Sequence, residues 1–165
     1  MTKQEKLFKD VFEANSKKIY HLCFGYTNDE AAANDLLQET FLKVWQNLDK
    51  FREQSQISTW IYRIAVNTCL TYLKKEKRQN KEELTPNIIE NQPEEVSEKQ
   101  EQINLLYTCI AKLEENERLI ITMVMDELPY PEIAEISGIK EGNLRVKIYR
   151  IKLKLTELYN QHEKF

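Results

Sequence analysis

The segment STWIYRIAVNTCLTYLKKEKR, residues 58–78, decides the fold class and gives the first indication of function. An apolar stripe recurs along it at helical spacing, formed by Tyr62, Val66, Cys69 and Leu73. The opposite stripe carries an aromatic ring, an amide, a hydroxyl and two cations, from Trp60, Arg63, Asn67, Thr71 and Lys74. This pattern predicts a helix with one face in a core and one face suited to nucleic acid, although an ordinary core seam around Trp60 is the alternative.

Helical patterns continue on both sides of this segment. Towards the amino terminus, we expect one helix that ends near Gly25, a capped restart at Asn28 and Asp29, and a second helix that runs to about Leu48. Residues 49–58 break the periodicity, and the Trp60 helix then continues to about Arg78. The whole chain holds only three Gly and four Pro, and its long stretches rich in Leu, Ile, Glu, Lys and Gln favour an all-α fold without sheet.

The composition changes after residue 78. Residues 79–96 are rich in Asn, Pro and Glu and bury too little apolar surface for a core, which predicts a flexible acidic linker. Helical periodicity returns near residue 101. We therefore predict two small helical domains, at residues 1–78 and 101–165, joined by a linker over 79–100.

The carboxyl-terminal stretch YPEIAEISGIKEGNLRVKIYRIKLKL, residues 130–155, has the order short helix, glycine turn, basic helix that is typical of a helix-turn-helix. In the basic helix, we expect Leu144, Ile148, Ile151 and Leu155 to face inward. The candidate DNA-reading side chains are Asn143, Arg145, Val146, Lys147, Tyr149 and Arg150. A helical hairpin with a solvated basic face is the alternative interpretation.

The net charge of −3 argues against a DNA-binding protein, but its distribution reverses that impression. Residues 60–81 and residues 140–154 each carry a net charge of +5, whereas residues 82–101 between them carry −6. The chain therefore has two basic segments and an acidic connector.

The second predicted helix presents an acidic outer face. Its inward stripe includes Ala33, Leu37, Phe41, Val44 and Leu48, which leaves Asp35, Gln38, Glu39, Leu42 and Gln46 outward. Acidic side chains repel DNA phosphates, so we expect a basic or polar protein partner here; an ordinary solvated face is the alternative.

The strings NDLLQETFLKVWQNLDKF (residues 34–51) and STWIYRIAVNTCLTYLKKEKR, followed by the helix-turn-helix, resemble the extracytoplasmic-function (ECF) group of sigma-70-type bacterial RNA polymerase sigma factors. The resemblance spans nearly the whole chain. It implies that the first domain is sigma region 2 and the last is sigma region 4.

The resemblance also implies roles for the candidate residues. Asp35, Leu36, Gln38, Glu39, Phe41 and Leu42 would bind the clamp helices of core RNA polymerase. Trp60, Arg63, Asn67, Thr71, Lys74, Lys75 and Arg78, with the loop at residues 51–58, would engage the minus-ten promoter element, including a base turned out of the stack. The helix from Glu141 would read the minus-thirty-five element, and an anti-sigma factor would be a further partner. The linker would follow a path towards the RNA channel, unless its glutamates reflect disorder alone.

The sequence departs from the family pattern at three positions. Lys140 and Pro129 stand where Ser or Thr is common before the two helices of the motif, and Val146 stands where a small polar residue is common. These differences bear on helix capping and on promoter specificity.

We find no sequence evidence for an enzyme, a metal site or a cofactor. The three cysteines, Cys23, Cys69 and Cys109, lack metal or redox spacing, so we expect buried reduced thiols in a cytoplasmic protein without a membrane span. We expect His21 in the core and His162 in solvent. A helix-turn-helix repressor or activator without a sigma role is the alternative function.

Overall fold

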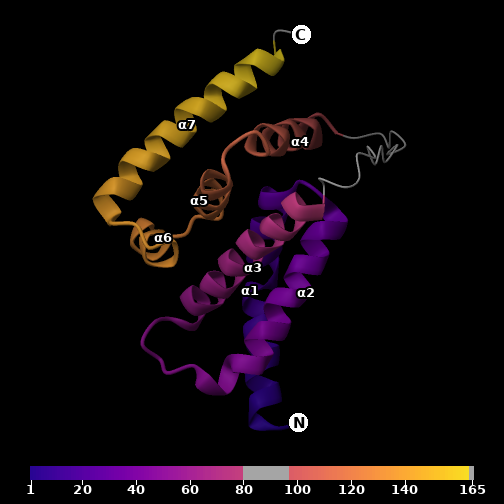
Figure 1. The fold of residues 1–165 in the computed structure, drawn as a ribbon, viewed down its shortest axis with the longest axis vertical. Helices are drawn as coiled ribbons and strands as arrows, with labels where there is room; N and C mark the ends of the chain where they lie inside the picture. The colour runs from indigo at the N-terminus through magenta and orange to yellow at the C-terminus, as the bar shows by residue number, and fades with distance from the viewer. Residues whose placement is uncertain (80–96, 164–165) are drawn as a thin grey trace.

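The computed structural model describes residues 1–79 and 97–163, and within them it consists of α-helices, one short 3-10 helix and connecting turns, with no β-strand. The all-α prediction is confirmed. In the amino-terminal half lie α1 (Lys3–Thr27), α2 (Glu30–Asn47) and α3 (Ile57–Gln79). In the carboxyl-terminal half lie α4 (Glu98–Ile110), α5 (Glu115–Met125), α6 (Tyr130–Ser137) and α7 (Glu141–Glu163), as Figure 1 shows. The predicted linker falls largely on residues 80–96, which lie outside the described residues.

The first helix begins and ends at recognisable capping residues, and the second begins at one. At the start of α1, the Thr2 hydroxyl accepts a hydrogen bond from the Glu5 amide, and the Glu5 carboxylate accepts one from the Thr2 amide. The helix ends at Asn28, whose φ of 50° is left-handed. Asp29 then caps α2 through a hydrogen bond from the Ala32 amide of 3.1 Å.

The first helix was expected to end near Gly25, and α1 ends two residues later, at Thr27, so Gly25 lies inside its last turn. Glycine at this position serves a close helix crossing instead of a helix end. A Cβ atom added to Gly25 would collide with the Thr122 hydroxyl of α5, so the absence of a side chain lets α1 and α5 approach each other. A glycine therefore marks an interhelical contact here.

The three amino-terminal helices pack around a strongly apolar interior. Ile19 and Leu22 of α1, Val44 of α2 and Ile61 of α3 have no exposed side-chain surface. Burying an aliphatic side chain of this size contributes about 1.5–3 kcal/mol of transfer free energy. Between α2 and α3, the 3-10 helix Leu48–Lys50 and residues 51–56 form the irregular connection that the broken periodicity predicts.

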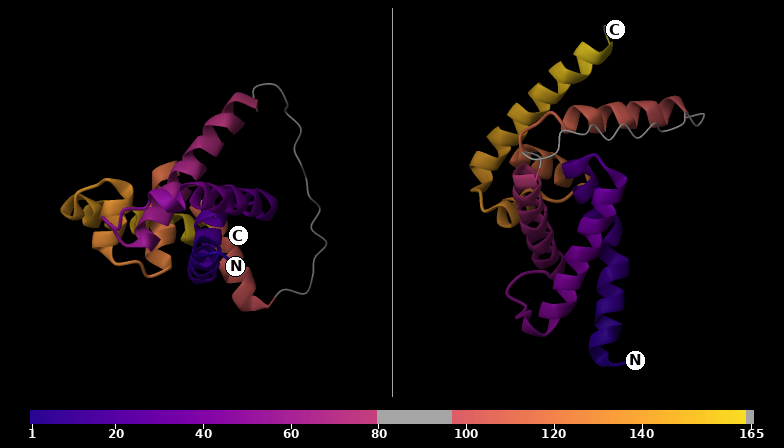
Figure 2. Two further views of the ribbon diagram at one scale, coloured as in Figure 1. Left: turned by 90° about the horizontal axis from the view of Figure 1, so that it is seen from below. Right: turned by 45° about the vertical axis from the view of Figure 1, so that its right-hand side comes forward.

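The two halves of the chain share one core. The cluster of buried apolar residues runs from Val11 in α1 to Leu155 in α7, and α5 and α6 contact α1 and α3 directly. Figure 2 shows the carboxyl-terminal helices packed on one end of the amino-terminal bundle, while the amino terminus lies at the opposite end of the molecule. The division into two domains stays a prediction, since it concerns independent folding.

The three thiols are completely buried, as expected, and all are free. Cys23 and Cys69, however, lie 4.0 Å apart across the α1–α3 contact, a juxtaposition that their sequence spacing does not indicate. A hydrogen bond to Cys23, together with burial, raises the pKa of the Cys69 thiol, and burial raises the pKa of Cys109. The three buried thiols act as core residues.

Candidate nucleic-acid interface

The two carboxyl-terminal helices form the expected helix-turn-helix. Pro129 and Pro131 lie at the start of α6, and the helix ends at Gly138, whose φ of 68° is left-handed. The turn places α7 across α6, and the α7 side chains of Leu144, Ile148 and Ile151 are buried. The predicted inward face of the basic helix is confirmed. The exposed fractions of Val146 and Tyr149 are 50% and 65%, so the opposite face is free.

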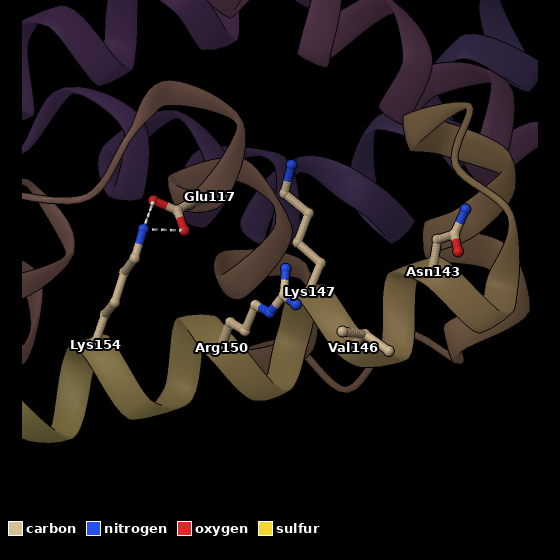
Figure 3. Close-up of a pocket in the computed structure, with 6 residues that line it drawn as sticks. All are labelled: Glu117, Asn143, Val146, Lys147, Arg150 and Lys154. Atoms are coloured by element: carbon tan, nitrogen blue, oxygen red, sulfur yellow. Dashed lines mark hydrogen bonds and ion pairs between the residues drawn. The ribbon is translucent and has the colours of Figure 1, made fainter.

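The six predicted minus-thirty-five residues lie on adjoining faces of α7. Four of them, Asn143, Val146, Lys147 and Arg150, line one hollow of about 530 Å³ (Figure 3). Arg145 lies on the other side, where its guanidinium is 3.0 Å from the Glu141 carboxylate and 5.0 Å from the centre of the Tyr130 ring. Both contacts hold Arg145 close to its own helix-turn-helix.

The hollow also contains two residues that the sequence interpretation missed, Glu117 of α5 and Lys154 of α7. The Lys154 ammonium donates hydrogen bonds of 2.9 and 3.1 Å to the two Glu117 oxygens, and these bonds raise the pKa of Lys154. Glu117 is 5% exposed and also accepts a hydrogen bond from the Glu114 amide. The ion pair with Lys154 compensates the negative charge of this buried carboxylate, which lies beside a basic surface.

The predicted minus-ten stripe runs along the side of α3 away from the buried Ile61, Ala65 and Cys69. Trp60 is half-buried, and its ring lies 5.2 Å from the Phe51 ring of the preceding loop. Arg63 contacts Glu135 of α6, with 3.2 Å between the guanidinium and the carboxylate. Asn67 is exposed on this stripe.

The last part of the stripe is open to solvent. The side chains of Thr71, Lys74 and Lys75 are exposed, and the Thr71 hydroxyl donates to the Asn67 carbonyl at 2.8 Å. The side chain of Arg78 lies outside the described residues. Trp60 therefore borders the core, whereas the amide and cationic groups of the stripe stay outside it.

The acidic face of α2 is exposed, as its periodicity predicts. Asp35, Gln38 and Glu39 reach solvent, and Leu42 is 56% exposed. Glu39 forms an ion pair of 3.3 Å with Lys43 one turn later.

Two residues assigned to this face are placed differently. Leu36 is 1% exposed and Phe41 is 3% exposed, so both belong to the core and neither can touch a partner. The helical repeat explains the difference, because Leu36 and Phe41 fall on the stripe that packs against α1 and α3. They pack beneath the exposed acidic face of α2.

An aromatic cluster beside the α2 face was not foreseen. Phe8 and Phe12 of α1 pack with Phe41 and Trp45 of α2, with ring centroids 4.8 to 6.3 Å apart. Trp45 and Phe12 remain 36% and 39% exposed. In each helix the two aromatic residues are four positions apart, but only the packing of α1 against α2 brings the two pairs together.

Neither histidine shows a ligand arrangement. His21 is half-buried and contacts Asp126 at 2.9 Å, and His162 is exposed and contacts Lys112 at 2.9 Å. Within the described residues, no group of three His, Cys, Asp or Glu side chains could hold a metal ion, and no helix is long and apolar enough to cross a membrane.

Comparison with known proteins identifies the class. Models of Sigma-70 region 2 and Sigma-70, region 4 match residues 11–79 and 103–155, in the order and places of the two candidate DNA-facing elements. The chain therefore has the organisation of a bacterial sigma factor. SigW of Bacillus subtilis is 31% identical over 87% of this chain and 83% of its own. The sigma-E factor of Escherichia coli K12 is 34% identical over 70% of this chain and 68% of its own.

The chain belongs to the ECF RNA polymerase sigma factors. It is thus a transcription initiation factor without enzymatic activity of its own, and the repressor alternative is not supported. The fold agrees with solved structures: the sigma factor RpoE of Bartonella quintana, crystallised with the anti-sigma factor NepR, matches with a TM-score of 0.77 at 21% identity, over 94% of this chain and 98% of that one. CnrH, in complex with the cytosolic domain of CnrY, matches with a TM-score of 0.68 at 18% identity, over 95% and 90% of the two chains.

Proposed function

We propose that the exposed face of α2 binds the core RNA polymerase and that α3 and α7 bind separate promoter elements. The observation that carries this division is the separation of charge between exposed faces. Asp35 and Glu39 lie on the outer side of α2, whereas Lys147, Arg150 and Lys154 lie together on α7. Phosphates attract the second surface and are repelled by the first.

For polymerase docking, the contact residues are Asp35, Gln38, Glu39 and Leu42. A half-exposed leucine among acidic and amide groups suits the polar rim and apolar centre of a protein interface. The buried Leu36 and Phe41 fix the position of this helix face, and the neighbouring aromatic cluster supplies further apolar surface.

For minus-ten recognition, the proposed side chains are Trp60, Arg63, Asn67, Thr71, Lys74, Lys75 and Arg78. The Phe51–Trp60 contact ties the preceding loop to the aromatic end of the stripe. An indole beside an irregular loop can stack on an unpaired base, while the cations further along α3 reach the backbone phosphates.

For minus-thirty-five recognition, α7 presents Val146 and Tyr149 outward, with Arg150 and Asn143 beside them. Short or planar side chains in the middle of the face can approach base edges, and the flanking cations can contact phosphates. Arg145 is held against Glu141 and Tyr130, so we assign it to phosphate contact at the border of the surface.

We further propose that residues 1–78 act as region 2 and residues 101–165 as region 4, and that the protein works in the cytoplasm, where core polymerase is found. The structurally similar RpoE was crystallised with the anti-sigma factor NepR, which supports an anti-sigma partner for this chain too. Such a partner is expected to suppress transcription by the purified chain with core enzyme.

In vitro transcription tests the function as a whole. Purified chain and bacterial core polymerase are incubated with fragmented genomic DNA, and the transcript starts are sequenced. We expect starts preceded by two shared sequence elements. Specific transcripts that are equally abundant with core enzyme alone would contradict the proposal.

A charge reversal tests the docking face. Asp35→Lys should weaken binding to core polymerase, because it places a cation where basic partners are expected, and should leave binding to promoter duplex unchanged. The matched control is Asp10→Lys, which makes the same change at an exposed site of α1. Equal losses of affinity for core polymerase in the two variants would show that the exposed face of α2 is not the docking surface.

A further inference from the structure

Lys154 continues a polar stripe of α7 that lines the hollow in Figure 3. The stripe recurs at helical spacing along one side of the helix and consists of Asn143, Lys147, Arg150 and Lys154. The first three are proposed contacts of the minus-thirty-five element, and Lys154 lies beyond them towards the carboxyl end of α7. The Lys154 side chain is 52% exposed, so its ammonium is accessible from solvent.

The length of this stripe places Lys154 at the border of a DNA groove. Lys154 follows Asn143 by 11 residues, which is about 16 Å along the helix axis. A major groove is about 12 Å wide. When the amino-terminal end of α7 reads base edges, Lys154 therefore lies where the groove ends and the phosphate backbone begins.

A carboxylate of the neighbouring helix α5 already binds this lysine. Hydrogen bonds of 2.9 and 3.1 Å join the Lys154 ammonium to the two Glu117 oxygens. The Glu117 side chain is only 7% exposed, and one of its oxygens also accepts a hydrogen bond of 3.2 Å from the Glu114 amide at the start of α5. The acid is therefore fixed in place, whereas its basic partner is accessible.

The burial of Glu117 decides which partner Lys154 keeps. If Lys154 moved to a phosphate, Glu117 would be left buried without a counter-charge. A buried carboxylate that loses its partner costs much more free energy than an exposed ion pair with a phosphate contributes. Lys154 therefore stays with Glu117 when DNA binds. The ion pair has no net charge, so it attracts no phosphate to this end of α7.

We propose that Glu117 withholds Lys154 from promoter DNA, so that α7 neutralises one phosphate fewer than its number of cations allows. This inference rests on the proposed minus-thirty-five role of α7. Glu117 acts through Lys154 as a positioning residue, and it sets the strength and the salt dependence of DNA binding. Phosphate contacts carry no sequence information, so the choice of bases belongs to the rest of the surface.

Two variants and a control separate the two charges. Glu117→Gln removes the negative charge but keeps the helix cap, because a glutamine oxygen can also accept the hydrogen bond from the Glu114 amide. Glu117→Gln/Lys154→Gln removes both charges and leaves no buried carboxylate unpaired. Glu157→Gln is the matched control, which makes the same change of charge at an exposed site of α7.

Fluorescence anisotropy of the full chain with labelled duplexes tests the proposal. One duplex carries the minus-thirty-five element mapped by the transcription experiment and the other a scrambled sequence, and the salt concentration is varied from about 50 to 200 mM. At about 100 mM salt, Glu117→Gln should bind both duplexes about two- to fivefold more tightly than the wild type. Its plot of log affinity against log salt should be steeper by about 0.9, the value for one further phosphate. The double variant should match the wild type, and Glu157→Gln should keep the wild-type slope.

The direction of the change separates this role from a purely structural one. Loss of the ion pair destabilises the fold at neutral pH, and a loosened helix-turn-helix would bind DNA more weakly. Tighter binding by a less stable Glu117→Gln therefore shows that Lys154 has been released. If Glu117 instead read a base, Glu117→Gln would discriminate less between the element and the scrambled sequence, and this result would overturn the proposal.

Three further results would overturn it. One is wild-type affinity and slope for Glu117→Gln that is folded, as judged by circular dichroism. Another is an equal increase in slope for Glu157→Gln, which would assign the effect to net charge. The third is a shallower slope for the double variant than for the wild type, because Lys154 would then already contact a phosphate. Should Glu117→Gln not fold, the slope of the double variant decides.

Failure of the proposed minus-thirty-five role gives a different result. The wild type in complex with core polymerase would then show no preference for the element over the scrambled duplex. The slopes measured on the scrambled duplex would still report whether Glu117 withholds Lys154 from phosphates.

Discussion

The orientation of α7 can be tested with two alanine substitutions two residues apart. Leu144 has no exposed side-chain surface, and its truncation leaves a cavity, so Leu144→Ala should cost about 2–5 kcal/mol. For a chain of this size each kcal/mol lowers the melting temperature by about 2–4 °C, which gives a loss of about 4–20 °C. Val146 is 50% exposed, so Val146→Ala should change stability by no more than about 0.5 kcal/mol.

The assay pairs thermal unfolding, followed by circular dichroism, with binding to a labelled minus-thirty-five duplex. Val146→Ala should melt like the wild type but change the preference among bases, because we propose that the exposed valine methyl groups contact the DNA groove. Leu144→Ala, measured well below its melting temperature, should keep the wild-type base preference, because Leu144 faces the core.

Similar melting temperatures for the two variants would refute the orientation of α7. If Val146→Ala has normal stability and the wild-type base preference, the orientation of α7 is correct but Val146 does not contact the bases. The two outcomes separate an error in the fold from an error in the assignment of the DNA contact.

Three further predictions concern other parts of the molecule. The three cysteine thiols should resist alkylation in the folded chain even at pH 9 and react on unfolding, because all three are buried and because a hydrogen bond and burial raise the pKa of Cys69. Rapid alkylation of the native chain would contradict this burial. Folding raises the pKa of Lys154 above the ordinary lysine pKa of 10.5. The ion pair with Glu117 therefore stabilises the folded chain fully at a pH below 10.5, and this stabilisation is lost as the pH rises through the pKa of Lys154 in the folded chain. The difference in melting temperature between the wild type and Glu117→Gln should therefore shrink above pH 10.5, and a difference independent of pH would exclude the pairing. Trp60→Ala should slow promoter opening by about 5- to 150-fold, the equivalent of one stacked base, with unchanged helical content, and Phe51→Ala should slow opening less. The permanganate reactivity of unpaired thymines measures opening by both variants. Normal opening by folded Trp60→Ala would show that the indole contributes to packing alone.

Much of the fold follows from local sequence. Helix hydrogen bonds and caps join residues three or four positions apart, so Asp29, Pro131 and Gly138 act where the sequence places them. The inward face of α7 and the outward acids of α2 follow from the helical repeat in the same way. A glycine gives the same local indication for a helix end and for a close helix contact, and Gly25, two residues before the end of α1, lies at such a contact.

The family resemblance extended this local information to function, and the comparisons confirm the family. It also assigned Leu36 and Phe41 to the docking surface, although the periodicity of α2 itself places Phe41 inward. Burial is decided by which side of the helix faces α1 and α3. A motif position therefore indicates the helix that carries a surface, but not whether its side chain is exposed.

By itself, the sequence determined the helices, their ends, the two basic segments and the family, because these depend on neighbouring residues and on motifs. Only the tertiary structure decided which distant groups meet. Cys23 and Cys69 are 46 residues apart, Glu117 and Lys154 are 37 apart, and Arg63 and Glu135 are 72 apart. Their contacts depend on how whole helices cross, which is set by the summed packing of many side chains, so no local pattern records them.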